Sequence, residues 1–205
     1  GAAGAIASAV AVPSIARAAA GDGPKVVGYF AQWAGVNHVT PDQLPADKLT
    51  HINYAFAHIV DGKCAPINAD NAADFLPRLV ALKKKQPRLR ILVSVGGWTD
   101  SEAFSDAALT AATRQKFAQS CADFLSANKL DGVDIDWEFP TGRGMAKNSA
   151  RPQDTHNFTL FLAAIRQSLD ARGKQDHKRY LLTIASPASP HNYDKIELKS
   201  IAKII

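Results

Sequence analysis

The chain has 205 residues, of which 46% are hydrophobic and 21% are charged, and its formal net charge is +5. This composition supports a substantial buried core and excludes a collagen-like or intrinsically disordered chain. Lys and Arg are spread along the sequence except at the run Lys83–Lys85, which we interpret as the solvated C-terminal end of a helix rather than a nucleic-acid-binding patch.

The N-terminal segment has the character of an export signal. Residues 1–20 are almost all small and apolar, contain no acidic side chain, and end in alanines before Gly21. This pattern is typical of a secretory leader, and an Ala-rich flexible tail is the alternative. The stretch is too short for a membrane span, and its side chains are too small. We therefore expect a leader remnant or flexible tail at 1–22 and one catalytic portion at 23–205. We also expect secretion to an extracellular or periplasmic location, with no membrane association after leader removal.

From Gly23 onward, short apolar runs alternate with longer amphipathic stretches. The short runs suit buried parallel strands, and the longer ones have the three- and four-residue apolar spacing of a helix packed on a sheet. We predict strands at Val26–Ala31, His51–Ala57, Leu89–Val95, Gly132–Phe139 and Tyr180–Ser186. We predict helices at Ala72–Lys85, Ala111–Ala127 and Thr155–Ala171, the last capped by Asp154 and ended by Gly173.

This repeating order of strand, helix and strand predicts an α/β fold with right-handed crossovers and a parallel sheet. A doubly wound open sheet and an eight-stranded barrel both fit the order. The loop after the first strand, at residues 30–35, lacks the GxGxxG pattern of a dinucleotide-binding sheet. We therefore expect no nucleotide cofactor at this position.

The two cysteines, Cys64 and Cys121, have no flanking pattern of a metal site or a disulfide framework. We predict two free thiols in the core, with one structural disulfide as the alternative.

The predicted strand at Gly132–Phe139 carries three acids at a spacing of two: Asp134, Asp136 and Glu138. In a strand this spacing directs all three side chains to one face, about 6.5–7 Å apart along the chain. Three like charges on a buried face raise the pKa of at least one of them, which keeps a carboxylic acid protonated for general acid catalysis. A solvated edge strand fits poorly because the opposite face is apolar. A metal-binding acidic cluster lacks the phosphate cradle or basic clamp that would accompany it.

The segment Asp131–Glu138 resembles the DxxDxDxE signature of glycoside hydrolase family 18, a family of chitinases and endo-β-N-acetylglucosaminidases. The block Ser94–Trp98 is similar to the SxGGW motif of that family, and weaker similarities lie at Gly28–Phe30 and Asn53–Phe56. The resemblance implies a (β/α)8 TIM barrel with its catalytic groups at the C-terminal ends of the strands. Only about the first five β/α units precede Ile205, so we expect the chain to be the N-terminal part of such a barrel, which takes about 250 residues.

The resemblance also implies a mechanism in which the 2-acetamido group of the substrate is the nucleophile. Glu138 is then the general acid and base, and Asp136 orients the acetamide and stabilises the oxazolinium ion. Asp134 shares a proton or charge with Asp136, and Ser94 is expected to donate a hydrogen bond to Asp134. Asp131 has the opposite strand parity, so we expect a structural role for it.

For substrate binding, the resemblance implies that Tyr29 and Phe56 line the floor of subsite −1 and that Trp98 stacks on the +1 sugar. Gly96 and Gly97 are expected to let the backbone approach the ligand closely. The activity implied is hydrolysis of chitin or chitooligosaccharides, without metal or cofactor, by a protein that is a monomer at full length. The alternatives are an endo-β-N-acetylglucosaminidase that acts on N-glycans, and an inactive or chitin-binding fragment.

Overall fold

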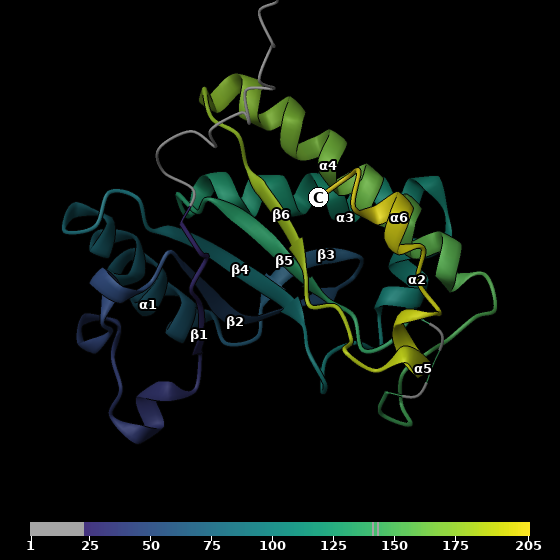
Figure 1. Cartoon of the computed structure of the whole chain (residues 1–205), viewed down its shortest axis with the longest axis horizontal. Coiled ribbons are helices and arrows are strands. Elements are labelled where there is room, and N and C mark those ends of the chain that lie inside the picture. The colour runs from purple at the N-terminus through teal and green to yellow at the C-terminus, as the bar shows by residue number, and fades with distance from the viewer. Residues whose placement is uncertain (1–22, 141, 143) are drawn as a thin grey trace, which may run out of the picture.

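The computed structural model describes residues 23–140, 142 and 144–205. Five parallel strands lie side by side in the order β1-β2-β4-β5-β6 (Figure 1). Their ranges are β1 Val27–Ala31, β2 His51–Val60, β4 Arg90–Gly96, β5 Gly132–Asp136 and β6 Leu181–Ile184. Within the part of the chain that the structure describes, β1 and β6 are the edges of this parallel array. The predicted α/β fold with a parallel sheet is therefore confirmed.

Helices cover one face of the sheet. Figure 1 shows α1 beside β1 and β2, and α3 next to α4. The α-helices are α1 Ala69–Ala81, α2 Phe104–Leu109, α3 Ala111–Ala127, α4 Asp154–Asp176, α5 Pro190–Tyr193 and α6 Leu198–Ile201. Short 3-10 helices are η1 Ala34–Asn37, η2 Pro41–Gln43, η3 Ala46–Lys48 and η4 Leu82–Lys84. None of the described helices combines the length and apolar character that crossing a membrane requires.

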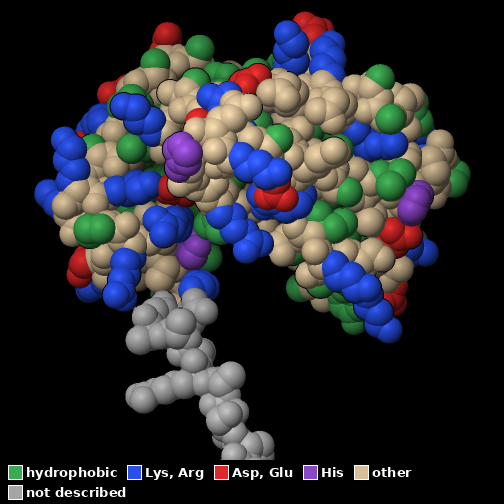
Figure 2. Space-filling view, turned by 90° about the horizontal axis from the view of Figure 1, so that it is seen from above, with side chains coloured by type: hydrophobic (Ala, Val, Ile, Leu, Met, Phe, Trp, Pro, Cys, Tyr) green, Lys and Arg blue, Asp and Glu red, His purple; other side chains and the backbone are tan. Residues whose placement is uncertain are grey.

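The period of two along each strand separates a covered face from an open one. On β5, Val133 and Ile135 are completely buried in the core beneath the helices. On β1, by contrast, Val27 and Tyr29 are about half exposed, at 50% and 52%. Figure 2, viewed from above relative to Figure 1, shows the outline indented between two lobes. The open face is therefore concave, as the inner wall of a barrel is.

The last long helix differs from its predicted bounds. The prediction that Gly173 ends it is wrong, because α4 continues to Asp176 and ends where His177 adopts a left-handed φ of 52°. Gly173 is needed within the helix, since a Cβ there would lie 2.3 Å from the Lys178 carbonyl oxygen. The predicted cap, Asp154, is the first helical residue, and its side chain accepts a hydrogen bond from the Arg151 backbone N–H at 2.8 Å.

A short hairpin strand, β3 Lys63–Pro66, was missed by the periodicity argument and pairs antiparallel with β2. Its signal is the dipeptide Asp61–Gly62, in which both residues have positive φ, 49° and 70°. Asp-Gly is a strong two-residue hairpin turn. The predicted free thiols are confirmed, because Cys64 on β3 and Cys121 on α3 are unbridged and buried.

Candidate active site

The three acids of the DxDxE segment do not all lie in the strand. Asp134 and Asp136 belong to β5 and face the open side of the sheet, opposite the core residues of the same strand. The predicted strand end at Phe139 is wrong, because ladder pairing stops at Asp136, opposite Gly96 of β4. Glu138 therefore stands beyond the sheet, at the C-terminal end of β5, where the catalytic groups of barrel enzymes are found.

Asp134 is held by three hydroxyl groups from three different strands. Its Oδ2 accepts hydrogen bonds from the Tyr29 hydroxyl at 3.0 Å and from Ser94 Oγ at 2.5 Å, and its Oδ1 accepts one from Thr183 Oγ1 at 2.6 Å. The predicted bond from Ser94 is confirmed. Sequence reasoning missed Thr183, because a single threonine in a short apolar run shows no pattern until the parallel register places it opposite Asp134.

Asp136 has the strongest acid–base perturbation in the site. Burial, followed by the charges of Glu138 and Asp134, raises its pKa to about 7. This confirms that crowding of the three acids raises at least one pKa. The Asp136 carboxyl makes no hydrogen bond to any residue in the described ranges, so Asp134 acts on it through charge rather than through a direct bond. Its oxygen atoms are free to receive a ligand.

Glu138 is partly buried, and burial raises the pKa of its carboxyl above the ordinary value. A raised pKa keeps a carboxylic acid protonated closer to neutral pH, which suits a proton donor. Glu138 is thus an acid that can donate a proton, and the charge on Glu138 influences the pKa of its neighbour Asp136.

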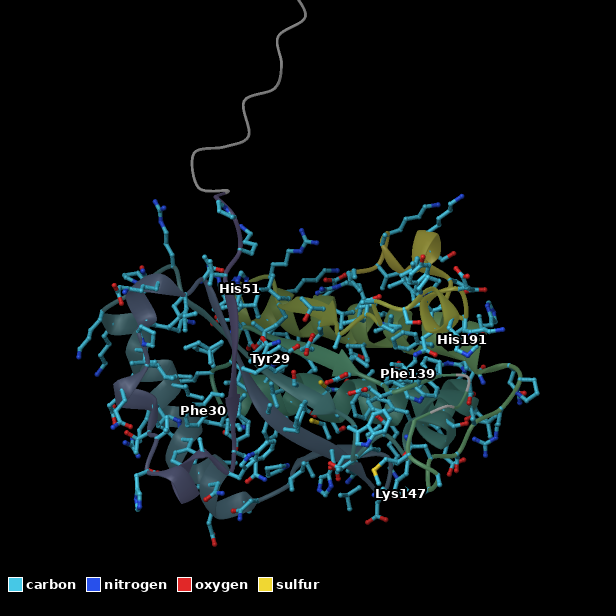
Figure 3. The ribbon with its side chains drawn as sticks, turned by 60° about the horizontal axis from the view of Figure 1, so that its bottom comes forward. Tyr29, Phe30, His51, Phe139, Lys147 and His191 are labelled. Carbon is cyan, nitrogen blue, oxygen red and sulfur yellow. The ribbon has the colours of Figure 1, made fainter. Side chains whose placement is uncertain are left out.

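Aromatic side chains surround this edge of the sheet. Trp98 is 52% exposed, as is Tyr29. Trp33 stacks on Phe56, with ring centroids 6.4 Å apart. Burial and the charge of Asp134 raise the pKa of Tyr29 to about 12, so its hydroxyl remains a donor. In Figure 3, Phe139 and His191 lie on the same side of Tyr29, in the direction in which β5 points.

Gly96 and Gly97 of the Ser94–Trp98 block are required by contacts within the protein itself. Gly96 and Gly97 have φ angles of +106° and +83°, which L side chains rarely adopt. A Cβ at Gly97 would lie 2.9 Å from the Phe56 ring, and one at Gly96 would lie 2.3 Å from the Asp136 carbonyl oxygen. These glycines therefore let the loop fold against the Phe56 ring and the end of β5.

Deeper along the open face is a hollow of about 330 Å³, bounded by Tyr29, Asn53, Leu92, Asp134 and Thr183 among others. It lies on the concave side that Figure 2 shows as an indentation. Asn53 Oδ1, on β2, is buried there without a hydrogen-bond partner. Over the described residues, no group of three or more His, Cys, Asp or Glu side chains is arranged to hold a metal ion.

Asp131 has the structural role that its strand parity predicted. Its carboxylate accepts both contacts of the Lys83 ammonium, each at 2.7 Å, and the Ile91 backbone N–H at 2.9 Å. The expectation that Lys83 is merely solvated is therefore wrong, because burial of Asp131 requires a paired cation. Lys84 and Lys85 are exposed.

A parallel half-barrel with acids at the C-terminal end of one strand has the arrangement of a barrel enzyme's active site, and paired carboxylates at such a site suit glycoside hydrolysis. The profile of Glycosyl hydrolases family 18 matches residues 25–205. Chitinase A1 of Niallia circulans is 40% identical, over 96% of this chain and 35% of its own length. The chain therefore belongs to glycosyl hydrolases family 18.

Solved structures agree with this assignment. Chitinase ChiA74 from Bacillus thuringiensis has a TM-score of 0.85 and 34% identity, covering 88% of this chain and 38% of that one. A family 18 N-acetylglucosaminidase from Paenibacillus barengoltzii has a TM-score of 0.77 and 37% identity, covering 89% of this chain and 51% of that one. This chain thus spans about a third to a half of the length of these three proteins.

Proposed function

We propose that the naturally encoded protein, meaning the product of the complete gene that contains this sequence, hydrolyses β-1,4-linked N-acetylglucosamine polymers. The observation that carries the proposal is the pair formed by Asp136 and Glu138, both with raised pKa values, at the mouth of an open barrel face. Membership of family 18 and the similarity to chitinases from several organisms support the substrate class.

The first step breaks the glycosidic bond. Glu138 gives its proton to the leaving oxygen as the bond to the anomeric carbon breaks, and the carbonyl oxygen of the substrate's acetamido group bonds to that carbon. Asp136 accepts a hydrogen bond from the acetamide N–H, and its negative charge stabilises the oxazolinium ion. An N–H donor and a cation both favour the ionised carboxyl, so binding lowers the pKa of Asp136 from its raised value in the free site.

The second step returns the site to its starting state. Water gives a proton to the Glu138 carboxylate while its oxygen bonds to the anomeric carbon and opens the oxazolinium ring. Asp134 is fixed by hydroxyl groups from β1, β4 and β6, and its charge acts on the neighbouring Asp136.

The sugar-binding surface would be formed by the residues around this mouth. Tyr29 and Phe56 would form the floor of subsite −1, and the exposed indole of Trp98 would stack on the +1 sugar. Ser94 and Gly97 would act indirectly, the first through Asp134 and the second by seating the loop that carries Trp98 against Phe56. No metal or cofactor takes part in this proposal.

We further propose that the protein is exported and acts as a monomer. Residues 1–22, proposed as the leader remnant or flexible tail, lie outside the described residues, and residues 23–205 are proposed as the catalytic portion. The absence of acids in residues 1–20 and the alanines before Gly21 support export.

The test is a pair of matched substitutions in the naturally encoded protein. Glu138→Gln keeps the shape of the side chain but cannot donate the proton, so cleavage of chitin oligosaccharides should fall by about two orders of magnitude or more while binding persists. Glu197→Gln is the control, because Glu197 lies at the start of α6 and contacts His156. Activity of Glu138→Gln near that of the control would contradict the proposal. Faster release of N-glycans than of chitin oligosaccharides would favour the endo-β-N-acetylglucosaminidase alternative.

A further inference from the structure

The peptide groups of Glu138 lie outside the β-ladder. On β5 the last residue in the parallel pairing is Asp136, opposite Gly96. Neither the N–H nor the carbonyl of Glu138 is therefore oriented by a strand hydrogen bond. A proton donor must be held to within a fraction of an ångström of the leaving oxygen, so other contacts have to fix this residue.

Ser101 supplies one of these contacts. It is completely buried, and its Oγ accepts a hydrogen bond from the Glu138 backbone N–H at 2.9 Å. The same hydroxyl donates to the Gly97 carbonyl at 2.8 Å and lies 3.2 Å from the Asp136 carbonyl. A single side chain thus joins the loop after β4 to the segment that carries the proton donor.

Asn148 supplies the other contact, from the opposite direction. Its Nδ2 donates to the Glu138 carbonyl at 2.9 Å. Gly144 also packs closely against Glu138, because a Cβ at Gly144 would lie only 1.9 Å from the Glu138 carbonyl oxygen. A few residues after Asn148, the Arg151 backbone N–H donates a hydrogen bond to the carboxylate of the buried Asp154, which anchors the chain there.

We propose that Ser101 and Asn148 are positioning residues, which hold the backbone of Glu138 from both sides and thereby aim its carboxyl at the glycosidic oxygen. This inference rests on the proposed role of Glu138 as proton donor. Loss of either contact leaves a peptide group of Glu138 without its partner and lets the acid move. The Asn148 bond involves neither Trp98 nor Tyr29, whereas Ser101 also holds the Gly97 carbonyl in the loop that carries Trp98.

The leaving group of the substrate distinguishes acid positioning from general structural damage. A sugar leaves only after protonation, whereas 2,4-dinitrophenolate leaves without it. The naturally encoded protein should be assayed with tetra-N-acetylchitotetraose and with the 2,4-dinitrophenyl glycoside of N,N′-diacetylchitobiose. Ser101→Ala and Asn148→Ala should each lower kcat/KM at least about tenfold for the tetrasaccharide and at most about threefold for the dinitrophenyl substrate. For Asn148→Ala, the dissociation constant for the tetrasaccharide should change by less than about threefold.

Ser168→Ala is the matched control, because Ser168 is a buried serine on α4 that contacts Gln115 and no residue of the site. It should lower both substrates' kcat/KM by less than about twofold. Equal losses on the two substrates, or a loss no larger than in the control, would overturn the inference for Ser101 and Asn148. Glu138→Gln should show the same leaving-group dependence. If Glu138→Gln shows this dependence and Ser101→Ala and Asn148→Ala do not, only the positioning inference fails. If Glu138→Gln keeps full activity, the proposed function and the positioning inference both fail.

Discussion

The hydroxyl of Tyr29 donates a hydrogen bond to Asp134 at 3.0 Å, although the two residues are 105 positions apart in the sequence. Tyr29 is on β1 and Asp134 is on β5, and β2 and β4 lie between them in the sheet. The bond therefore crosses the concave face. Together with the bonds from Ser94 and Thr183, it shows that Asp134 is held by side chains of three other strands, β1, β4 and β6.

The three hydroxyl donors to Asp134 should differ in their contribution to stability. Ser94 is completely buried, Thr183 is partly buried and Tyr29 is half exposed. A hydrogen bond to a charged group contributes about 1.5–3 kcal/mol when buried and less when water can replace the donor. We expect the loss of unfolding free energy to be largest for Ser94→Ala, smaller for Thr183→Val and smallest for Tyr29→Phe. Urea denaturation measures this order, and a larger loss for Tyr29→Phe than for Ser94→Ala would contradict it.

Asp136 should make stability depend on pH in a defined direction. Its pKa is about 7 in the folded chain against 3.8 for an ordinary aspartate, so the folded state keeps this proton when the unfolded state has lost it. The stability linked to this group is complete below about pH 4 and is lost as the pH rises toward 7. Asp136→Asn, which cannot ionise, should therefore gain unfolding free energy relative to the parent between pH 5 and pH 8, by on the order of 2 kcal/mol.

Urea denaturation of both proteins at the two pH values tests this expectation. Asp123→Asn is a suitable control, because Asp123 lies on α3 and contacts Arg172 and Gln119. The same difference between Asp136→Asn and its parent at pH 5 and pH 8 would show that Asp136 does not keep its proton in the folded chain.

Gly97 should tolerate alanine less well than Gly62. Both have positive φ, +83° and +70°, so both substitutions strain the backbone by about 1 kcal/mol or more. At Gly62 the nearest atom to the new Cβ is the flexible side chain of Lys116 at 3.4 Å, whereas at Gly97 the Phe56 ring lies at 2.9 Å. Thermal unfolding should show a larger loss for Gly97→Ala. Its chitin-oligosaccharide turnover should also fall, while Gly62→Ala keeps turnover close to that of the parent.

Local sequence patterns predicted the parts of this fold that local chemistry controls. The helix at Ala111–Ala127 was predicted with the observed bounds from its apolar spacing, and the structure adds Thr110 as its N-cap. The strand at Gly132–Phe139 was predicted too long, since its end depends on where β4 and β6 stop pairing with it. Gly173 was misread for a similar reason, because its role is set by the Lys178 carbonyl that packs against it.

The same distinction applies to the candidate site. The spacing of Asp134, Asp136 and Glu138 made the acids visible in the sequence, and crowding of like charges predicted a raised pKa. Thr183 and Ser101 were not visible, because a single serine or threonine has no pattern until the fold places it beside its partner. Their contacts are with residues 49 and 37 positions away.

In the proposed mechanism, the substrate's own acetamido group attacks the anomeric carbon while Glu138 donates the proton. Attack by the acetamido oxygen and then by water inverts that carbon twice, so the configuration is retained. Proton NMR of a fresh hydrolysate of chitin oligosaccharides, made with the naturally encoded protein, reports directly which anomer is released first. We predict that the β-anomer appears first and converts to the α-anomer only by later mutarotation. Initial release of the α-anomer would contradict the mechanism and the roles assigned to Asp136 and Glu138.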